Sequence, residues 1–152
     1  MDNNGFYKIT EYLMLIAEGI EINNTVLFAQ SEDKDLYKNN LYPLIHINPN
    51  SSPLSISNGS IAFSFEIGIL DKRIEDNQSG PKKQGNFNII DTFATTSAIL
   101  NEYVSEISRN IGSEFILENI TEATPIYYDD KNGLDGWVFQ LTISLANNVD
   151  FC

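Results

Sequence analysis

The sequence predicts an α+β fold, with a mainly antiparallel sheet, two helices packed on one face of it, and a long exposed arm. Residues 61–70 and 137–145 alternate apolar and polar side chains, as half-buried strands do. Residues 7–21 and 92–110 instead repeat apolar side chains at the spacing of amphipathic helices. The strands are not separated by regular crossover helices, so we do not expect a doubly wound parallel sheet.

The first helix is predicted from Tyr7 to Glu21, and Gly19 should weaken its last turn. Its apolar stripe consists of Ile9, Tyr12, Leu13, Ile16 and Ile20. The β-prone residues Thr25–Ala29 predict a short strand, and the charged residues Ser31–Asn40 a loop or a helical turn. A further strand lies within Leu41–Ile47. Because Pro43 has no amide hydrogen for a ladder, this strand is an edge strand or begins after the proline.

Residues Asn48–Ser60 are rich in Asn, Pro, Ser and Gly and predict a loop. The strand Ile61–Leu70 follows it. Residues Asp71–Asn86 are the most irregular stretch of the sequence and predict the long arm or an extended hairpin.

The second helix is predicted from Thr92 to Asn110, with Asp91 as its N-cap and Gly112 in the left-handed position after its end. Its buried stripe consists of Leu100, Tyr103, Val104, Ile107 and Ile111. A strand is expected at Phe115–Thr121.

The last strand is the clearest, since Trp137, Phe139, Leu141, Ile143 and Leu145 all fall on one of its faces. No linker or repeat divides the sequence. We therefore expect a single domain over 1–152, with a C-terminal tail at about 146–152.

The net charge of −12 argues against binding of nucleic-acid phosphates and against an anionic membrane surface. The charge has two interpretations. It keeps the protein soluble, or it forms an acidic surface that nucleic acid passes without binding. We see no basic, apolar leader and no segment apolar enough to span a bilayer, so no membrane partner is expected. The single cysteine, Cys152, excludes an internal disulfide.

His46 is the only histidine, and it lies inside a predicted strand. No Gly-x-Ser-x-Gly motif accompanies it, so a structural or surface role is favoured over catalysis. There is also no phosphate-binding glycine loop, no Cys/His metal spacing and no dinucleotide fingerprint. We expect no catalytic residue, no metal and no cofactor.

Oxygen-bearing side chains crowd the turn before the last strand, at Asp129, Asp130, Asn132 and Asp135. A calcium loop needs oxygen ligands at fixed odd positions and a glutamate at the twelfth. Counted from Asp130, the fifth position is Leu134 and the twelfth is Leu141, so the pattern fails. A hairpin turn built from Asp, Asn and Gly is the better interpretation.

Two short features suggest protein contacts rather than chemistry. Lys82 and Lys83 are too few for a nucleic-acid footprint; they are a solvated loop tip or a contact for an acidic neighbour. Near the end of the sequence, Phe151 is an aromatic residue outside any predicted core, which favours a protein partner. Cys152 has no neighbouring base to activate it; a reactive thiol and a tail packed into another subunit both remain open.

The order of these features resembles the small virion proteins of the neck and tail of tailed bacteriophages, close to the tail-completion and tail-terminator proteins. The matching stretches are Leu41-Tyr-Pro-Leu-Ile45, the strand Ile61–Asp71, the helix Asp91–Asn110, and Asp129-Asp-Lys-Asn-Gly-Leu-Asp-Gly-Trp137 running on to Asp150-Phe-Cys152. Each motif is short, and their order carries the resemblance across most of the sequence. The Lys-containing arm departs from the pattern.

This resemblance implies a non-enzymatic virion subunit, made in the bacterial host cytoplasm, that forms a ring with copies of itself at the head–tail connection or tail. Its other partners would be neck or tail proteins, and DNA would pass without specific binding. The contacts between subunits would involve Asp71, Lys72, Lys82, Lys83, Asn86, Phe151 and Cys152. Two other classes stay open: a small protein-binding module or assembly chaperone without catalytic activity, and a hydrolase that uses His46 and an acidic residue.

Overall fold

A computed structural model of the protein describes residues 5–28, 42–49, 55–57, 60–73, 88–110, 115–129 and 133–145. The two helices are α1 (Gly5–Glu18) and α2 (Asn88–Asn110). The strands are β1 (Thr25–Phe28), β2 (Leu44–Pro49), β3 (Ser55–Ser57), β4 (Ser60–Lys72), β5 (Phe115–Ile120), β6 (Thr124–Asp129) and β7 (Leu134–Leu145).

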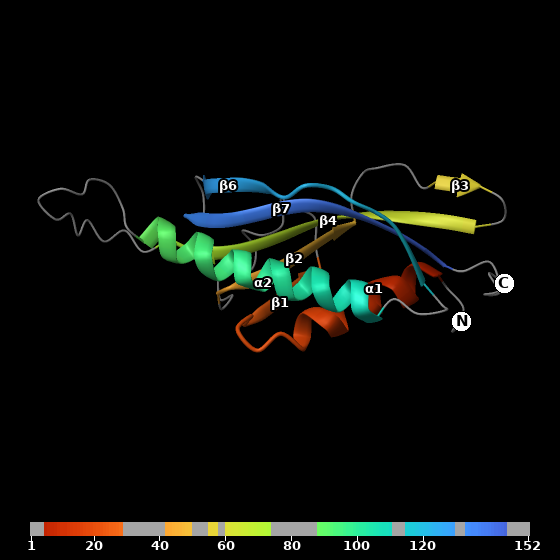
Figure 1. The fold of residues 1–152 in the computed structure, drawn as a ribbon, viewed down its shortest axis with the longest axis horizontal. Coiled ribbons are helices and arrows are strands. Elements are labelled where there is room, and N and C mark those ends of the chain that lie inside the picture. Colours follow the sequence, from red (N-terminus) through yellow and green to blue (C-terminus); the bar gives the residue numbers. More distant parts are fainter. Residues whose placement is uncertain are drawn as a thin grey trace, which may run out of the picture.

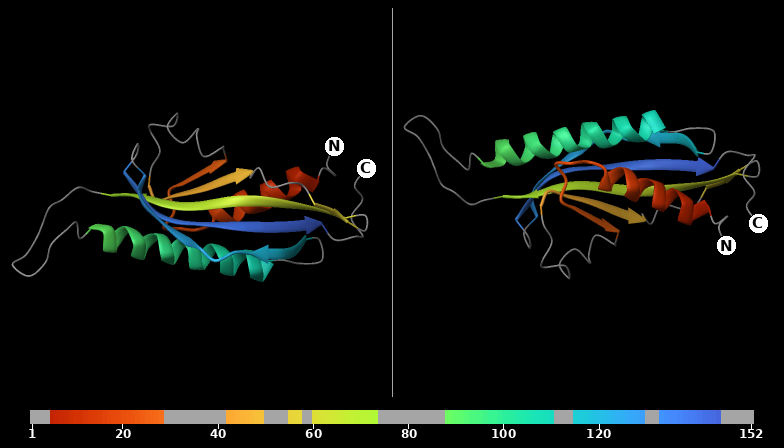
Figure 2. Two further views of the ribbon diagram at one scale, coloured as in Figure 1. Left: turned by 90° about the horizontal axis from the view of Figure 1, so that it is seen from above. Right: turned by 90° about the horizontal axis from the view of Figure 1, so that it is seen from below.

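All seven strands belong to one sheet, with the order β1-β2-β4-β7-β5. The short strand β3 also pairs with β4, and β6 also pairs with β7. Only the β1–β2 pair is parallel. Both helices lie on the same face of this sheet (Figures 1 and 2). The predicted α+β fold, with a mainly antiparallel sheet and helices on one face, is confirmed.

The main core lies between the sheet and the two helices. The long central strands β4 and β7 contribute alternate residues to it, and these residues include Phe65, Ile67, Ile69, Phe139, Leu141 and Ile143. The helices contribute Ile9 and Leu13 from α1, and Ile99, Tyr103 and Ile107 from α2. Each such side chain removed from water contributes roughly 1.5–3 kcal/mol. The alternation and the helical stripes seen in the sequence therefore identify most of this core.

The opposite face of the sheet changes character along its length. At one end, Leu27, Leu44, Leu70 and Leu134 form a smaller apolar cluster against which Tyr42 and Ile126 pack. Further along, this face is polar: the hydroxyls of Ser64 and Thr142 share a hydrogen bond of 2.9 Å. Where its side chains are polar, this face can contact water, so no helix has to pack against it.

Some element boundaries differ from the prediction. Helix α1 ends at Glu18 rather than Glu21, and the amide of Gly19 closes its last turn by donating to the carbonyls of Leu15 and Ile16. Ile20 lies beyond the helix yet remains only 2% exposed, which explains why the apolar spacing runs past the helix end. Strand β2 begins directly after Pro43, one of the two alternatives left open.

Helix α2 begins at Asn88, so the prediction that Asp91 is its N-cap is wrong. Asp91 instead lies in the first helical turn, where a carboxylate is favoured by the exposed amides of the helix start. The predicted loop Asn48–Ser60 is also partly wrong, because β2 continues to Pro49 and β3 occupies Ser55–Ser57.

The sequence prediction missed strand β6. It follows β5 along the same edge of β7, and the two are joined across a short break where the Thr121 amide donates to the Gln140 carbonyl at 3.0 Å. Pro125 is tolerated in β6 because this strand lies at the sheet edge. The hairpin to β7 is confirmed: Asp129 pairs with Leu134, and Gly133 takes a φ of 62°.

Several predicted features lie outside the described residues. They are the segment Ser31–Asn40, the C-cap Gly112, the arm beyond Arg73 and the tail 146–152.

Two tyrosines fasten the helices to each other. The Tyr103 hydroxyl of α2 donates to the Leu13 carbonyl of α1 at 3.0 Å, and the Tyr12 hydroxyl of α1 donates to the Ile107 carbonyl of α2 at 3.0 Å. Tyr103 is fully buried, and burial raises the pKa of its hydroxyl far above the ordinary range. The folded state therefore holds this proton at pH values where the unfolded chain releases it.

Replacing Tyr103 with phenylalanine should lower the free energy of unfolding at pH 7 by about 1 kcal/mol, the usual contribution of one hydrogen bond. Above pH ~10 the wild-type protein should lose stability with rising pH, because only the unfolded state releases the Tyr103 proton; one such group contributes up to about 1.4 kcal/mol per pH unit. The variant should lose stability less steeply. Urea unfolding between pH 7 and 11 measures both effects. Tyr127→Phe, at an exposed tyrosine, is the control, and equal slopes for both variants would contradict the assignment.

Candidate functional site

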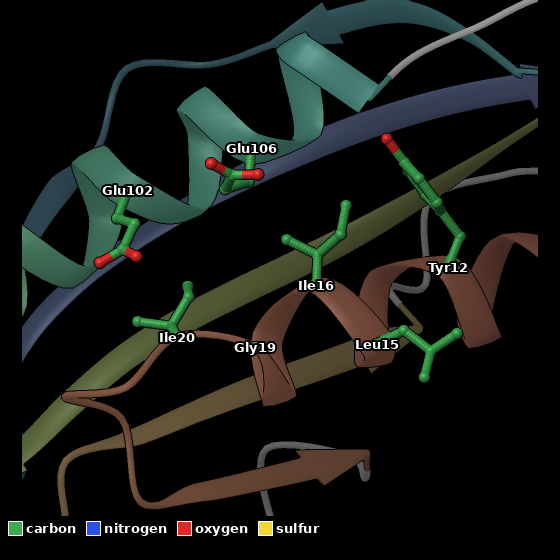
Figure 3. A pocket seen from close by; sticks show the side chains of 7 residues that line it. All are labelled: Tyr12, Leu15, Ile16, Gly19, Ile20, Glu102 and Glu106. Atoms are coloured by element: carbon green, nitrogen blue, oxygen red, sulfur yellow. The ribbon is translucent and has the colours of Figure 1, made fainter.

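A groove of about 580 Å³ lies between the two helices on the outer side of the helical layer. It is lined by Tyr12, Leu15, Ile16, Gly19, Ile20, Glu102 and Glu106. Figure 3 shows Ile16 and Ile20 pointing from α1 and the turn after it toward α2, while the two glutamates project from α2 above them. The groove therefore has an apolar side and an acidic side.

The acidic side comes from Glu102 and Glu106, one helical turn apart on α2. Glu106 also accepts an ion-pair contact of 2.6 Å from Arg109, whose side chain is 70% exposed. The pKa of the nearby Tyr12 hydroxyl is raised, first by burial and then by the negative charge of Glu106. The groove thus carries a negative potential that favours a cationic ligand.

Large apolar side chains extend this surface beyond the groove. On α1 and the turn that follows it, Tyr7 is 63% exposed, Leu15 60% and Ile22 47%. Elsewhere Ile90, Ile116 and Tyr127 are also exposed. Single exposed apolar residues are ordinary, but several beside one groove favour contact with another protein. The sequence showed the apolar residues of α1 as one core stripe and did not separate those that line the groove.

A buried ion pair lies at the other end of α2, where β4 ends. Asp135 of β7 is completely buried, and both of its oxygens accept from Arg73: Nε donates to Oδ2 at 2.7 Å and Nη2 to Oδ1 at 2.6 Å. The Thr92 hydroxyl of α2 lies 3.3 Å from Oδ2, but it also lies 2.9 Å from the Ile89 carbonyl, the closer acceptor. Asp135 therefore connects the end of β4, the start of α2 and the start of β7.

Asp71 and Lys72, two of the predicted subunit contacts, lie beside this ion pair. Asp71 is directly opposite Asp135 in the β4–β7 ladder. Its pKa is raised mainly by burial and further by the Asp135 charge, while a hydrogen bond from the Lys72 amide acts in the opposite direction. The Lys72 side chain is exposed. Of the predicted contact residues, the structure describes only Asp71 and Lys72, which are neighbours in sequence. The other five, Lys82, Lys83, Asn86, Phe151 and Cys152, lie outside the described residues.

The aromatic residues near the last strand divide into packed and exposed groups. Trp137 lies edge-on to Phe93 of α2, with ring centroids 5.4 Å apart, in agreement with its expected packing role. Tyr127 also contacts Phe93 but is 66% exposed at the edge of the sheet. This side of the sheet therefore presents an aromatic surface next to the edge strand β6.

His46 is 3% exposed on β2, where it pairs with Gly68 on the face of the sheet away from the helices. It does not line the groove between the helices. Over the described ranges, no three His, Cys, Asp or Glu side chains gather in a way that would hold a metal ion. Neither described helix is both long and apolar enough to cross a bilayer.

A scan against protein-family models and a search of curated proteins both find no match to this sequence.

Proposed function

We propose that this protein is a structural subunit that forms a ring with copies of itself at the head–tail connection or tail of a tailed bacteriophage. The observation that carries the proposal is the exposure of large apolar side chains at both flanks of the sheet. Tyr7 and Ile22 lie on the α1 side, and Ile116 and Tyr127 lie on the β5–β6 edge. Two different surfaces on opposite flanks suit a head-to-tail contact that closes into a ring.

The two edges of the sheet add to this argument. In the described part of the chain, β1 pairs only with β2 at one edge, and β5 and β6 pair only with β7 at the other. Edge strands offer main-chain donors and acceptors to a neighbouring chain. The resemblance to phage neck and tail proteins is the reason for proposing that the assembly lies at the head–tail connection or tail. The net charge of −12 suits a channel through which DNA passes without binding.

The test is to measure the native mass of the assembly for three variants and to look for the protein in purified phage particles. Ile116→Asp combined with Tyr127→Ser should convert the ring to folded monomers; both side chains are exposed, and the main intramolecular loss is the ring contact of Tyr127 with Phe93, about 1 kcal/mol. Glu122→Ser, an exposed polar site between them, should leave the ring intact. Shortening the segment between Asp71 and Asn86 should also impair assembly.

A wild-type protein that is monomeric at all concentrations and missing from particles would overturn the ring proposal. If that monomer instead forms a discrete complex with one partner, the protein is a binding module or an assembly chaperone. Loss of an enzymatic activity in a folded His46→Ala variant would replace both interpretations with a hydrolase.

A further inference from the structure

We propose that the groove between α1 and α2 binds a helical segment of a different protein, one that carries lysine or arginine beside a row of aliphatic side chains. This binding is separate from ring assembly, since the groove is lined neither by Tyr7 and Ile22, the ring contacts on the α1 side, nor by the β5–β6 edge. It does not depend on where in a virion the protein resides.

The floor of the groove selects aliphatic groups. Ile16 and Ile20 point across it toward α2, and Leu15 stands at its rim with 60% of its surface in water (Figure 3). The Tyr12 hydroxyl is already engaged by the Ile107 carbonyl, so the tyrosine offers the groove its ring rather than a hydrogen bond. Because Ile20 is only 2% exposed, a ligand gains affinity here mainly by covering Leu15 and the exposed part of Ile16.

The wall of the groove selects positive charge. Glu102 is exposed, and no described residue forms an ion pair with it. Glu106 is already paired along α2 with Arg109, so Glu102 contributes most of the negative charge available to a ligand. A partner with carboxylates at this position would be repelled.

The dimensions favour a helical ligand. The lining residues on α1 begin at Tyr12 and those after it continue to Ile20, so the groove runs along the last two turns of this helix, about 10 Å. Glu102 and Glu106 are four residues apart, the spacing at which side chains lie on one helical face. A helix laid in the groove can therefore place two basic side chains, three or four residues apart, against the wall and its aliphatic face on the floor.

A second copy of this chain does not supply such a segment. The lysine pair lies in Ser79-Gly-Pro-Lys-Lys-Gln-Gly-Asn86, which has charge but no large aliphatic or aromatic side chain for the floor. Lys34 and Lys38 flank Leu36 and Tyr37, but Glu32, Asp33 and Asp35 outweigh their charge. The occupant that fits both sides of the groove is thus another protein.

The probe is a synthetic helical peptide of leucine and lysine with all leucines on one face. Its affinity is measured by calorimetry with the full-length protein. The combined change Glu102→Gln and Glu106→Gln should weaken binding about fivefold to tenfold, and Leu15→Ser should weaken it to a similar degree. The control Glu66→Gln with Glu122→Gln removes the same charge away from the groove and should change affinity less than twofold. A peptide of the same composition with scattered leucines should bind more weakly than the amphipathic one.

Three results would overturn the proposal. Equal weakening by the groove variant and the control would show attraction by net charge alone. Equal binding of the scattered peptide would remove the role of the floor. A groove variant that changes the native mass of the protein but not peptide affinity would assign the groove to contacts between copies. Ring assembly is tested separately, by the native mass of the variant changed at Ile116 and Tyr127. Either proposal can therefore fail without the other.

Discussion

Replacing Gly136 with alanine should destabilise the protein by about 3 kcal/mol or more. A methyl group at this position would meet the Ile69 carbonyl oxygen at 1.9 Å, the Ile69 carbonyl carbon at 2.9 Å and the Leu70 Cα at 3.0 Å. All three atoms belong to the backbone of β4, so no side chain can rotate to make room. The methyl group can be accommodated only if the two central strands move apart, which disrupts their ladder over the core.

The sheet contains its own control for this experiment. Gly68 also lies inside a central strand, but a methyl group there would approach only side-chain atoms of His46 and Leu70, at 3.8–3.9 Å. These are ordinary packing distances, so Gly68→Ala should change stability by less than about 1 kcal/mol. Urea unfolding of the two variants and the wild type at one temperature makes the comparison. Equal destabilisation of both variants would mean that replacing a glycine in these strands, rather than the close approach of the β4 backbone to Gly136, lowers the free energy of unfolding.

Replacing Asp135 with asparagine should lower the free energy of unfolding by about 3–5 kcal/mol, because it removes the buried carboxylate to which both Nε and Nη2 of Arg73 donate. Arg73 is only 14% exposed, so water cannot fully replace the lost carboxylate. The ion pair also fixes the end of β4 against the starts of α2 and β7. We therefore expect faster amide exchange at Arg73, whose amide donates to the Gly133 carbonyl at 2.9 Å.

The control for this prediction is the ion pair of Arg109 and Glu106, which has the same 2.6 Å separation but lies in water. Arg109→Ala should cost less than about 1 kcal/mol. Chemical unfolding of both variants, with Arg73→Met and the double variant completing a mutant cycle, gives the coupling between Arg73 and Asp135. A coupling energy below about 1 kcal/mol, the usual range of exposed ion pairs, would show that the contact between Arg73 and Asp135 contributes little to stability.

The sequence predicted best those elements that have regular apolar spacing and bury one face. Strands β4 and β7 and both helices meet this condition, and most of their core residues were predicted, although the fully buried Ile99 was missed and Trp137 lies outside the core cluster. Strands β3 and β6 were missed because they are short edge strands in segments rich in turn-forming residues or proline. Such strands owe their conformation to hydrogen bonds with a neighbour distant in sequence, and no local pattern records that neighbour.

The candidate site was less accessible from the sequence. The burial of Asp135 depends on the register that brings β4 and β7 together, so the sequence showed it only as one more acidic residue in a turn. The groove depends on how far α1 and α2 separate, and helical spacing alone does not determine that distance. A signal was present nonetheless: Glu102 and Glu106 share a face of α2, and Glu102 has no basic residue three or four positions to either side of it.

The position of β7 in the chain has a consequence for biosynthesis. This strand is the last described element to leave the ribosome, yet it pairs with β4, β5 and β6 and supplies Phe139, Leu141, Ile143 and Leu145 to the main core. Before it emerges, β4 lacks its longest partner and β5 and β6 have no strand beside them. The sheet therefore cannot close until β7 has emerged, and the nascent polypeptide is a substrate for chaperones until that point.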